Sequence, residues 1–310
     1  MPKSKGIKFH NLVSFALHKN DQIYAGLHPE WNTMLDSGGF TNFVRGKDVV
    51  TLKQYCDFLK EERGLFWQYM ALDRIGDQKV SGEYLRMMKS LGLDPIPIYQ
   101  RGEGSATDLK NMLRTHFMVA VGGISQQLNA TAEQEYLRNV MKVINQVDTS
   151  RVHLLGVGLR EAYMYAPYSA DSSTWTSHLR FAILRLYYRG KFVEFAKHPG
   201  ARNGKNYVKP SIEKTRVLRQ YGLTWDDLYV YEDWSKTTSK ISIAGARSWM
   251  RQCRALIRKN SRYSLACIPV NVEALHEAWN YERRSWGWSS PKHFVFKTTW
   301  KNNIPNKLKK

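Results

Sequence analysis

The first 180 residues alternate short apolar runs with longer stretches whose apolar residues recur at helical intervals. Unbroken apolar runs of this length are typical of strands that are buried on both faces of a parallel sheet. The runs are TMLDSGG (33–39), GLFWQYMALD (64–73), DPIPIYQ (94–100), HFMVAVGG (116–123), RVHLLGVG (151–158) and YMYAPYSAD (163–171). Helices are predicted between them at 52–62, 82–92 and 132–147. The alternation predicts an α/β fold, either a doubly wound sheet or a (β/α)8 barrel.

The residues that end these runs favour the barrel. Nearly every run closes on a polar residue or a glycine, and the carboxyl ends of barrel strands meet at one rim, where active sites are built. A dinucleotide-binding sheet would instead gather its glycines in one G-x-G-x-x-G turn, which this sequence lacks, as it lacks a Walker-type phosphate loop. The run-end residues are Asp36, Asp73, Gln100, Gly122, Gly123, Gly158 and Asp171. We therefore expect a TIM-like barrel with residues 1–190 as its catalytic core.

Positive charge is concentrated in the later part of the chain. Residues 181–310 hold 26 of the 47 Lys and Arg but only 9 of the 27 Asp and Glu, a net charge of +17 out of +20. This asymmetry favours a polyanionic partner, with a generally basic soluble surface as the alternative. We expect residues 191–310 to complete the barrel and to add a basic, helix-rich region that binds nucleic acid.

Within this region, residues 246–260 are predicted to form a helix with a stripe of arginines. The spacing i, i+4, i+7 puts them on one face, where like charges repel unless an anion is bound, although a solvated charged face is the alternative. The predicted phosphate contacts are Arg247, Arg251, Arg254 and Arg258, followed by Lys259. The basic loop 197–210 and the tail 283–310, in which cations alternate with aromatic residues, suit phosphate and base contacts.

Cysteine usage and hydropathy bear on the compartment. Cys56, Cys253 and Cys267 are widely spaced and odd in number, which is typical of reduced thiols in a cytoplasmic protein. No run of about 18 apolar residues occurs, so we expect no membrane span. The N-terminal segment also lacks the apolar stretch of a signal peptide.

Residues 30–175 resemble the tRNA-guanine transglycosylases. LDSGGF (35–40) is similar to that family's LDSGGFQ signature, and SADSSTW (169–175) falls where the family has its nucleophilic aspartate. The motifs between them follow in the family's order: ALD (71–73), PIPIYQ (95–100), VAVGGIS (119–125) and LLGVG (154–158). Among the family, the chain is most similar to the phage-type DNA 7-deazaguanine transglycosylases, the DpdA group.

The resemblance implies an enzyme that exchanges guanine in nucleic acid for a 7-deazaguanine base such as preQ0. It assigns Asp171 as the nucleophile that forms a glycosyl ester and Asp36 as the general acid and base. Paired carboxylates at a sugar carbon are in any case the usual equipment for glycosidic bond exchange. The implied base-binding residues are Asp73, Gln100, Gly122, Gly123, Phe40 and Leu155. No cofactor is implied, because one N-glycosidic bond is broken and another is made.

Two departures from the family separate this chain from enzymes that act on tRNA. Thr41 replaces the usual glutamine after DSGGF, and the family's zinc site is missing. Cys253 and Cys267 lack the ligand spacing of a tetrahedral site, so we expect no metal and no zinc subdomain. Because that subdomain contributes to tRNA docking, double-stranded DNA is the predicted partner and tRNA the runner-up. A homodimer is compatible with the family.

Two other classes of function remain open. One is a non-catalytic paralogue that binds nucleic acid, although both Asp36 and Asp171 are present. The other is an unrelated nuclease that uses Asp36, Asp73 and Asp171 to bind magnesium. Dependence on a metal ion distinguishes the nuclease from the transglycosylase. We assign His153, in HLLGVG, to the core or to a supporting position.

Overall fold

The computed structural model forms two compact units. It describes residues 9–16, 22–25, 27, 31–101, 104–124, 130–147, 151–157, 164–165, 167–172, 174–197, 210–231, 234, 239–259, 264–267 and 272–285. Unit 1 comprises residues 1–172, 260–268 and 295–310, and unit 2 comprises residues 173–259 and 269–294. Unit 2 is therefore inserted into the chain of unit 1, whereas the sequence placed the change of character near residue 190.

Unit 1 is built on a sheet of eight parallel strands, which confirms the predicted α/β fold with a parallel sheet. The strand order is β3-β2-β1-β10-β7-β6-β5-β4, and an isolated parallel bridge joins Met70, next to β3, to Ile96, just before β4. The strands are β1 (Phe9–Ser14), β2 (Trp31–Asp36), β3 (Gln68–Tyr69), β4 (Ile98–Tyr99), β5 (Val119–Val121), β6 (Val152–Leu154), β7 (Ser169–Ser172) and β10 (Ser264–Cys267).

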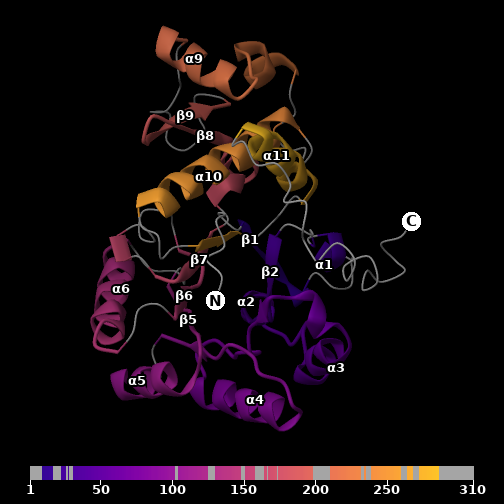
Figure 1. The fold of residues 1–310 in the computed structure, drawn as a ribbon, viewed down its shortest axis with the longest axis vertical. Coiled ribbons are helices and arrows are strands. Elements are labelled where there is room, and N and C mark those ends of the chain that lie inside the picture. Colours follow the sequence, from indigo (N-terminus) through magenta and orange to yellow (C-terminus); the bar gives the residue numbers. More distant parts are fainter. Residues whose placement is uncertain are drawn as a thin grey trace. The chain divides into compact units, whose positions relative to one another are not determined.

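Helices surround the strands of unit 1 (Figure 1). They are α1 (Gln22–Ala25), α2 (Gly39–Arg45), α3 (Leu52–Glu62), α4 (Gln78–Ser90), α5 (Ala106–Thr115) and α6 (Ala130–Ile144), with a 3-10 turn at Arg63–Leu65. The predicted helices at 52–62, 82–92 and 132–147 correspond to α3, α4 and α6. Helix α3 begins at a capping box, in which the Thr51 side chain accepts from the Gln54 N–H and the Gln54 side chain accepts from the Thr51 N–H.

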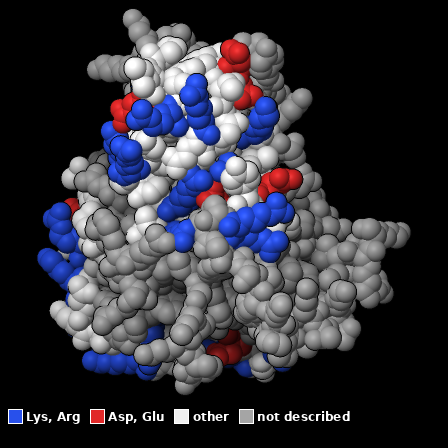
Figure 2. All heavy atoms as spheres, turned by 45° about the horizontal axis from the view of Figure 1, so that its top comes forward, with Lys and Arg blue, Asp and Glu red and all other residues white. Residues whose placement is uncertain are grey.

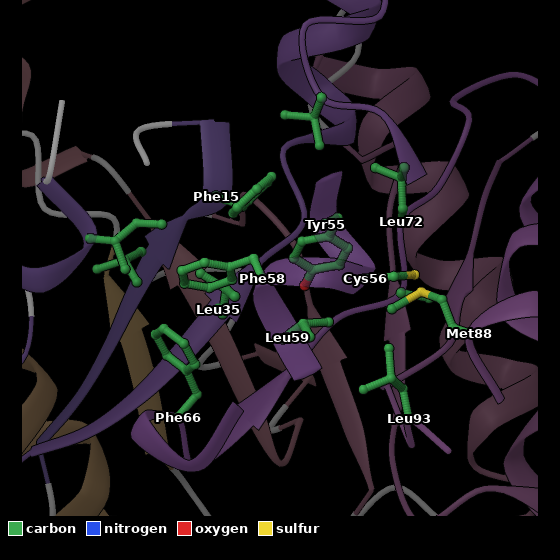
Figure 3. Packing of buried hydrophobic residues seen from close by; sticks show 14 of the residues in the cluster. Phe15, Leu35, Tyr55, Cys56, Phe58, Leu59, Phe66, Leu72, Met88 and Leu93 are labelled. Atoms are coloured by element: carbon green, nitrogen blue, oxygen red, sulfur yellow. The ribbon is translucent and has the colours of Figure 1, made fainter. Parts of the chain in front are cut away.

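Residues alternate between the two faces of the sheet. Val13, Leu35 and Ala71 pack on one face against Tyr55 of α3 and Met88 of α4. Figure 3 shows this cluster, in which the Phe15 ring lies 5.1 Å from that of Tyr55 and 5.0 Å from that of Phe58, centroid to centroid. The other face carries a second apolar cluster to which Leu12, Met34, Met70, Ile98 and Ala120 contribute.

This second face becomes polar toward the carboxyl ends of the strands. Residues two positions apart share a face, so Asp36 follows Met34, Gln100 follows Ile98, and Gly122 follows Ala120 on the same side. Ser14 stands in the same relation to Leu12. The sequence therefore builds an apolar layer and then a polar layer, and the polar layer holds the predicted site.

Unit 2 combines a two-stranded antiparallel hairpin with helices. Its elements are η3 (Thr174–Thr176), α8 (Ser177–Phe181), β8 (Ile183–Tyr188), β9 (Lys191–Ala196), α9 (Ile212–Gln220), a π-helical turn at Asp227–Tyr231, α10 (Lys240–Lys259) and α11 (Val272–Ser285). Phe195, Leu218 and Ile241 lie in one buried core. In the part of the chain that the structure describes, no helix is both long and apolar enough to cross a bilayer.

Candidate functional site

The four polar residues predicted to form the site lie in or shortly after strands of one sheet. Asp36 is the last residue of β2, Gln100 directly follows β4, and Asp171 lies in β7. Asp73 follows β3 by four residues. The carboxylates influence one another, since the charge of Asp171 raises the pKa of Asp36 and the charge of Asp36 raises that of Asp73. The structure thus brings the predicted carboxylates together.

Asp36 is poised to exchange a proton near neutral pH. Burial raises its pKa to about 6, and the charge of Asp171 adds to this effect. A hydrogen bond from Ser14 and one from the Gly38 N–H, which donates to Oδ2 at 3.1 Å, act in the opposite direction. A carboxyl group with a pKa in this range works efficiently both as an acid and as a base.

Asp73 and Gln100 form a buried pair. The Gln100 Nε2 donates to Oδ2 of Asp73, and the Ser37 hydroxyl donates to Oδ1 at 3.4 Å. Burial raises the pKa of Asp73 to about 7, the charge of Asp36 adds to it, and the hydrogen bond from Gln100 lowers it. The Oε1 atom of Gln100 is buried and accepts no hydrogen bond from the described part of the chain. Its hydrogen-bonding capacity is therefore unsatisfied by the described residues.

Two glycines make room for this pair. A Cβ atom at Gly39 would lie 2.1 Å from Oδ1 of Asp73, and one at Gly122 would lie 2.9 Å from both polar atoms of the Gln100 amide. A side chain at Gly39 would also meet the Asp73 backbone oxygen at 2.8 Å, and one at Gly122 would displace the Gln100 amide. The Gly122 N–H donates to the Tyr99 carbonyl at 2.9 Å, so this glycine contributes space to the site. Gly123 has a φ of 73°, a left-handed backbone conformation that favours glycine.

Asp171 is held by two neighbours on β6 and the turn after it. The Gly156 N–H donates to its Oδ1 at 2.9 Å, and the Nε2 atom of His153 lies 3.3 Å from the same oxygen. The other ring nitrogen of His153, Nδ1, lies 2.7 Å from the Ser169 hydroxyl. His153 is completely buried and Asp171 is 2% exposed.

The sequence assigned no specific role to His153 or to Ser169. Ser169 could have been found, because it lies two positions before Asp171 and so shares its face of the strand. The position of His153 opposite Ser169 depends on the register between β6 and β7, which the sequence does not reveal.

The two residues predicted to sandwich the base lie in different surroundings. Phe40, in α2, is 55% exposed. Leu155 is partly buried and packs against the cluster that contains Leu12 and Met34. Their stacking on a base stays a prediction. A cleft of about 300 Å³ runs from the α2–α3 connection to Asp73, with Phe43, Arg74 and Tyr84 in its walls. Asp73 also lines this cleft, whereas Gln100 does not.

Two of the arginines predicted to bind phosphate are paired with a carboxylate of the chain itself. Arg247 is 3% exposed, and its Nε donates to Oε1 of the buried Glu282 at 2.8 Å. Arg251 donates to Oε2 of the same carboxylate at 2.8 Å. The sequence predicted a bound anion to offset the repulsion between these arginines. In the structure Glu282 of α11 supplies that negative charge. Arg254 is partly buried.

Several other sequence predictions lie outside the described residues. They are Gly158, residues 198–209 of the basic loop, residues 286–310 of the tail, and the side chains of Arg258 and Lys259. Among the described residues, the exposed cations of unit 2 are Arg189, Lys191, Lys197, Arg216, Arg219, Lys240 and Arg284. Figure 2 shows Lys and Arg spread over one face of the molecule, with several Asp and Glu among them.

No protein-family model matches the sequence, and no curated protein matches it. Within the described ranges, no three His, Cys, Asp or Glu residues are grouped so as to hold a metal ion. What the site can do is therefore inferred from its own residues: a carboxylate fixed by donors, a carboxyl group that titrates near neutrality, and a buried pair with an open acceptor.

Proposed function

We propose that this protein exchanges guanine in double-stranded DNA for a 7-deazaguanine base through a covalent aspartyl intermediate. The observation that carries the proposal is the set of three interacting carboxylates at the strand ends, whose environments differ. Asp171 accepts the Gly156 N–H at Oδ1, the pKa of Asp36 is about 6, and Asp73 is paired with an amide. Carboxyl groups in distinct environments can take different roles in one site, here those of nucleophile, of general acid and base, and of base recognition.

We also infer that the sheet of unit 1 closes into a (β/α)8 barrel. Its eight strands are parallel and are followed by helices in most cases, and the Met70–Ile96 bridge connects the two ends of the strand order. The apolar cluster of Leu12, Met34 and Ile98 would fill the interior. In such a barrel the polar layer at the carboxyl ends of the strands is the active-site rim.

In the proposed reaction Asp171 attacks the anomeric carbon through Oδ2, and the bond from that carbon to guanine breaks. The electron pair of this bond passes to the base, and Asp36 delivers a proton to it. The incoming 7-deazaguanine then loses a proton to Asp36 and attacks the same carbon, and the Asp171 carboxylate leaves. Two displacements at one carbon retain its configuration, and no cofactor is consumed.

Asp73 and Gln100 supply the groups that recognise the base. Guanine and 7-deazaguanines offer donors at the ring N–H and the amino group and an acceptor at the carbonyl. The open Oε1 of Gln100 and the carboxyl oxygens of Asp73 accept from these donors. The absence of side chains at Gly39 and Gly122 lets the two residues lie close together beside a flat ring.

Charge supports a nucleic acid as the polymer. Unit 2 holds 21 Lys and Arg against nine Asp and Glu, and several of these cations are exposed. A base within a duplex has to be flipped out to present its anomeric carbon, and backbone contacts offset the few kcal/mol that flipping costs. Phosphate contacts by unit 2 would supply them.

An exchange assay tests the proposal. The full-length protein is incubated with radiolabelled guanine and either duplex DNA or tRNA, with and without EDTA. Label in DNA that is insensitive to EDTA is expected. Label in tRNA alone would establish the runner-up. Metal-dependent cleavage would indicate the nuclease, and tight DNA binding without either reaction would indicate a non-catalytic paralogue.

A further inference from the structure

We propose that His153 and Ser169 are positioning residues that hold the Asp171 carboxylate and stabilise it when it leaves the sugar. The inference rests on the proposed function of Asp171 as nucleophile. It goes beyond that function because it assigns a task to a buried, titratable side chain that the reaction scheme does not use.

Strand register brings the three residues together. The Cα atom of His153 on β6 is paired with that of Ser169 on β7. Asp171 lies two residues after Ser169 and therefore on the same face of β7. His153, Ser169 and Asp171 are 0%, 1% and 2% exposed, so water does not compete for their polar atoms.

The chemistry of the three groups fixes where the protons are. A carboxylate only accepts, so the His153 Nε2, which lies 3.3 Å from Oδ1, is attracted to it only when it carries hydrogen. In the neutral ring Nδ1 is then an acceptor, and the Ser169 hydroxyl, 2.7 Å away, is its donor. The opposite tautomer would direct a lone pair at a buried carboxylate. The carboxylate therefore selects the tautomer, and the Ser169 hydroxyl, which can donate or accept, completes it by donating to Nδ1.

The contact between His153 and Asp171 is close but not yet a well-aligned hydrogen bond, since Nε2 makes none in this structure. In the proposed arrangement the carboxylate turns so that Nε2 donates to Oδ1. Together with the Gly156 N–H, the ring gives Oδ1 two donors and leaves Oδ2 to the reacting carbon. In the glycosyl ester the carboxylate charge is absent, and it returns as the ester breaks. Donors on Oδ1 therefore favour breakdown of the ester over its formation.

The test compares His153→Leu, His153→Gln and Ser169→Ala with a control from unit 2. His178 is also buried, with its Nε2 2.8 Å from the Ser242 hydroxyl, so His178→Leu removes an equivalent His–Ser contact within unit 2. We expect His153→Leu to lower kcat for exchange by roughly 10- to 100-fold, with an unchanged KM for the free base and a larger trapped fraction of covalent adduct. His153→Gln, which keeps an N–H near Nε2, should recover most of the rate.

Ser169→Ala should reduce kcat less than His153→Leu, and His178→Leu should leave kcat per folded molecule unchanged. Exchange at the wild-type rate in His153→Leu, or losses that follow thermal stability alone with no recovery in His153→Gln, would overturn the inference. If the wild type exchanges no base, the proposed function fails separately. Nitrogen-15 NMR of the histidines then decides the arrangement itself: the Nε2–H tautomer at His153 supports it, and the Nδ1–H tautomer refutes it.

Discussion

The two units each bury a cluster of charged groups. The clusters differ in whether the neighbouring charges are of opposite or of like sign. In unit 2 one carboxylate, Glu282, is shared by Arg247 and Arg251 at 2.8 Å each. In unit 1 the carboxylates face one another, and burial together with like charge raises the pKa of Asp36 to about 6 and of Asp73 to about 7. Complementary charges hold helices together, whereas like charges destabilise the fold and persist where they act on a ligand. The same residue types therefore serve structure in one unit and are proposed to serve chemistry in the other.

The largest effect is expected at Asp171. Asp171→Asn keeps the size of the side chain but cannot form a glycosyl ester, so exchange should fall by about four orders of magnitude or more. DNA affinity and thermal stability should stay near those of the wild type. A denaturation-resistant protein–DNA adduct is expected from the wild type only, and an adduct that persists in the variant would assign the nucleophile elsewhere.

The second effect tests the cluster of unit 2. Arg247→Ala leaves one of two charges opposite Glu282, which is fully buried, and should destabilise the protein by about 3–5 kcal/mol in denaturant titrations. Arg284→Ala, an exposed position on α11, should change stability by less than about 0.5 kcal/mol. If Arg247→Ala instead weakened DNA binding at unchanged stability, the arginine would belong to the DNA-binding surface after all.

The third effect follows from the raised pKa of Asp73. The pKa of Asp73 is near 4 in the unfolded chain and about 7 in the folded protein. Between these two pH values the folded protein holds a proton that the unfolded chain has lost, so its free energy of unfolding falls as the pH rises from 4 to 7. Asp73→Asn has no such proton to lose. It should be more stable than the wild type by roughly 2–4 kcal/mol at pH 8 and nearly equal at pH 4, while base affinity falls. Melting curves at both pH values check this, and a variant less stable at pH 8 would contradict it.

The smallest effect concerns the exposed cations of unit 2. Reversing Arg216 and Arg219 on α9 to Glu should weaken DNA binding and flatten the log–log dependence of affinity on salt, by about 0.9 for each phosphate that the protein no longer neutralises. The matched control reverses Lys60 and Arg114, which are exposed on α3 and α5 of unit 1. Equal changes in slope for the two double variants would mean that unit 2 has no special part in binding.

The sequence predicted those parts of the fold that depend on local pattern. The bounds of α3 were predicted to the residue, because a capping box and helical spacing agree there. The hairpin β8–β9 was missed; its turn is built on positive φ angles at Arg189 and Gly190, and a tyrosine–arginine sequence gives little sign of a turn. The stripe on α10 was misread because the partner of Arg247, Glu282, lies 35 residues away on another helix.

The same distinction applies to the candidate site. Asp36, Gln100 and Asp171 were identifiable because each ends or lies in an apolar run, and strand ends converge in parallel sheets. The contacts of His153 with Ser169 and Asp171 were not, since they depend on the register of two strands that 14 residues separate. Contacts fixed by pairing between distant segments leave no local pattern in the sequence.

The place of β10 determines how late in translation the sheet can be completed. This strand, residues 264–267, is the last of the sheet in the chain, yet it lies between β1 and β7, with Ala266 paired to Asp171. During translation, β1 and β7 have no common neighbour until all of residues 173–259 have left the ribosome. Pairing across such a distance is slow because loop closure has a large entropic cost. A nascent chain that ends at residue 259 would contain every proposed catalytic side chain and still lack the strand that holds the nucleophile in register.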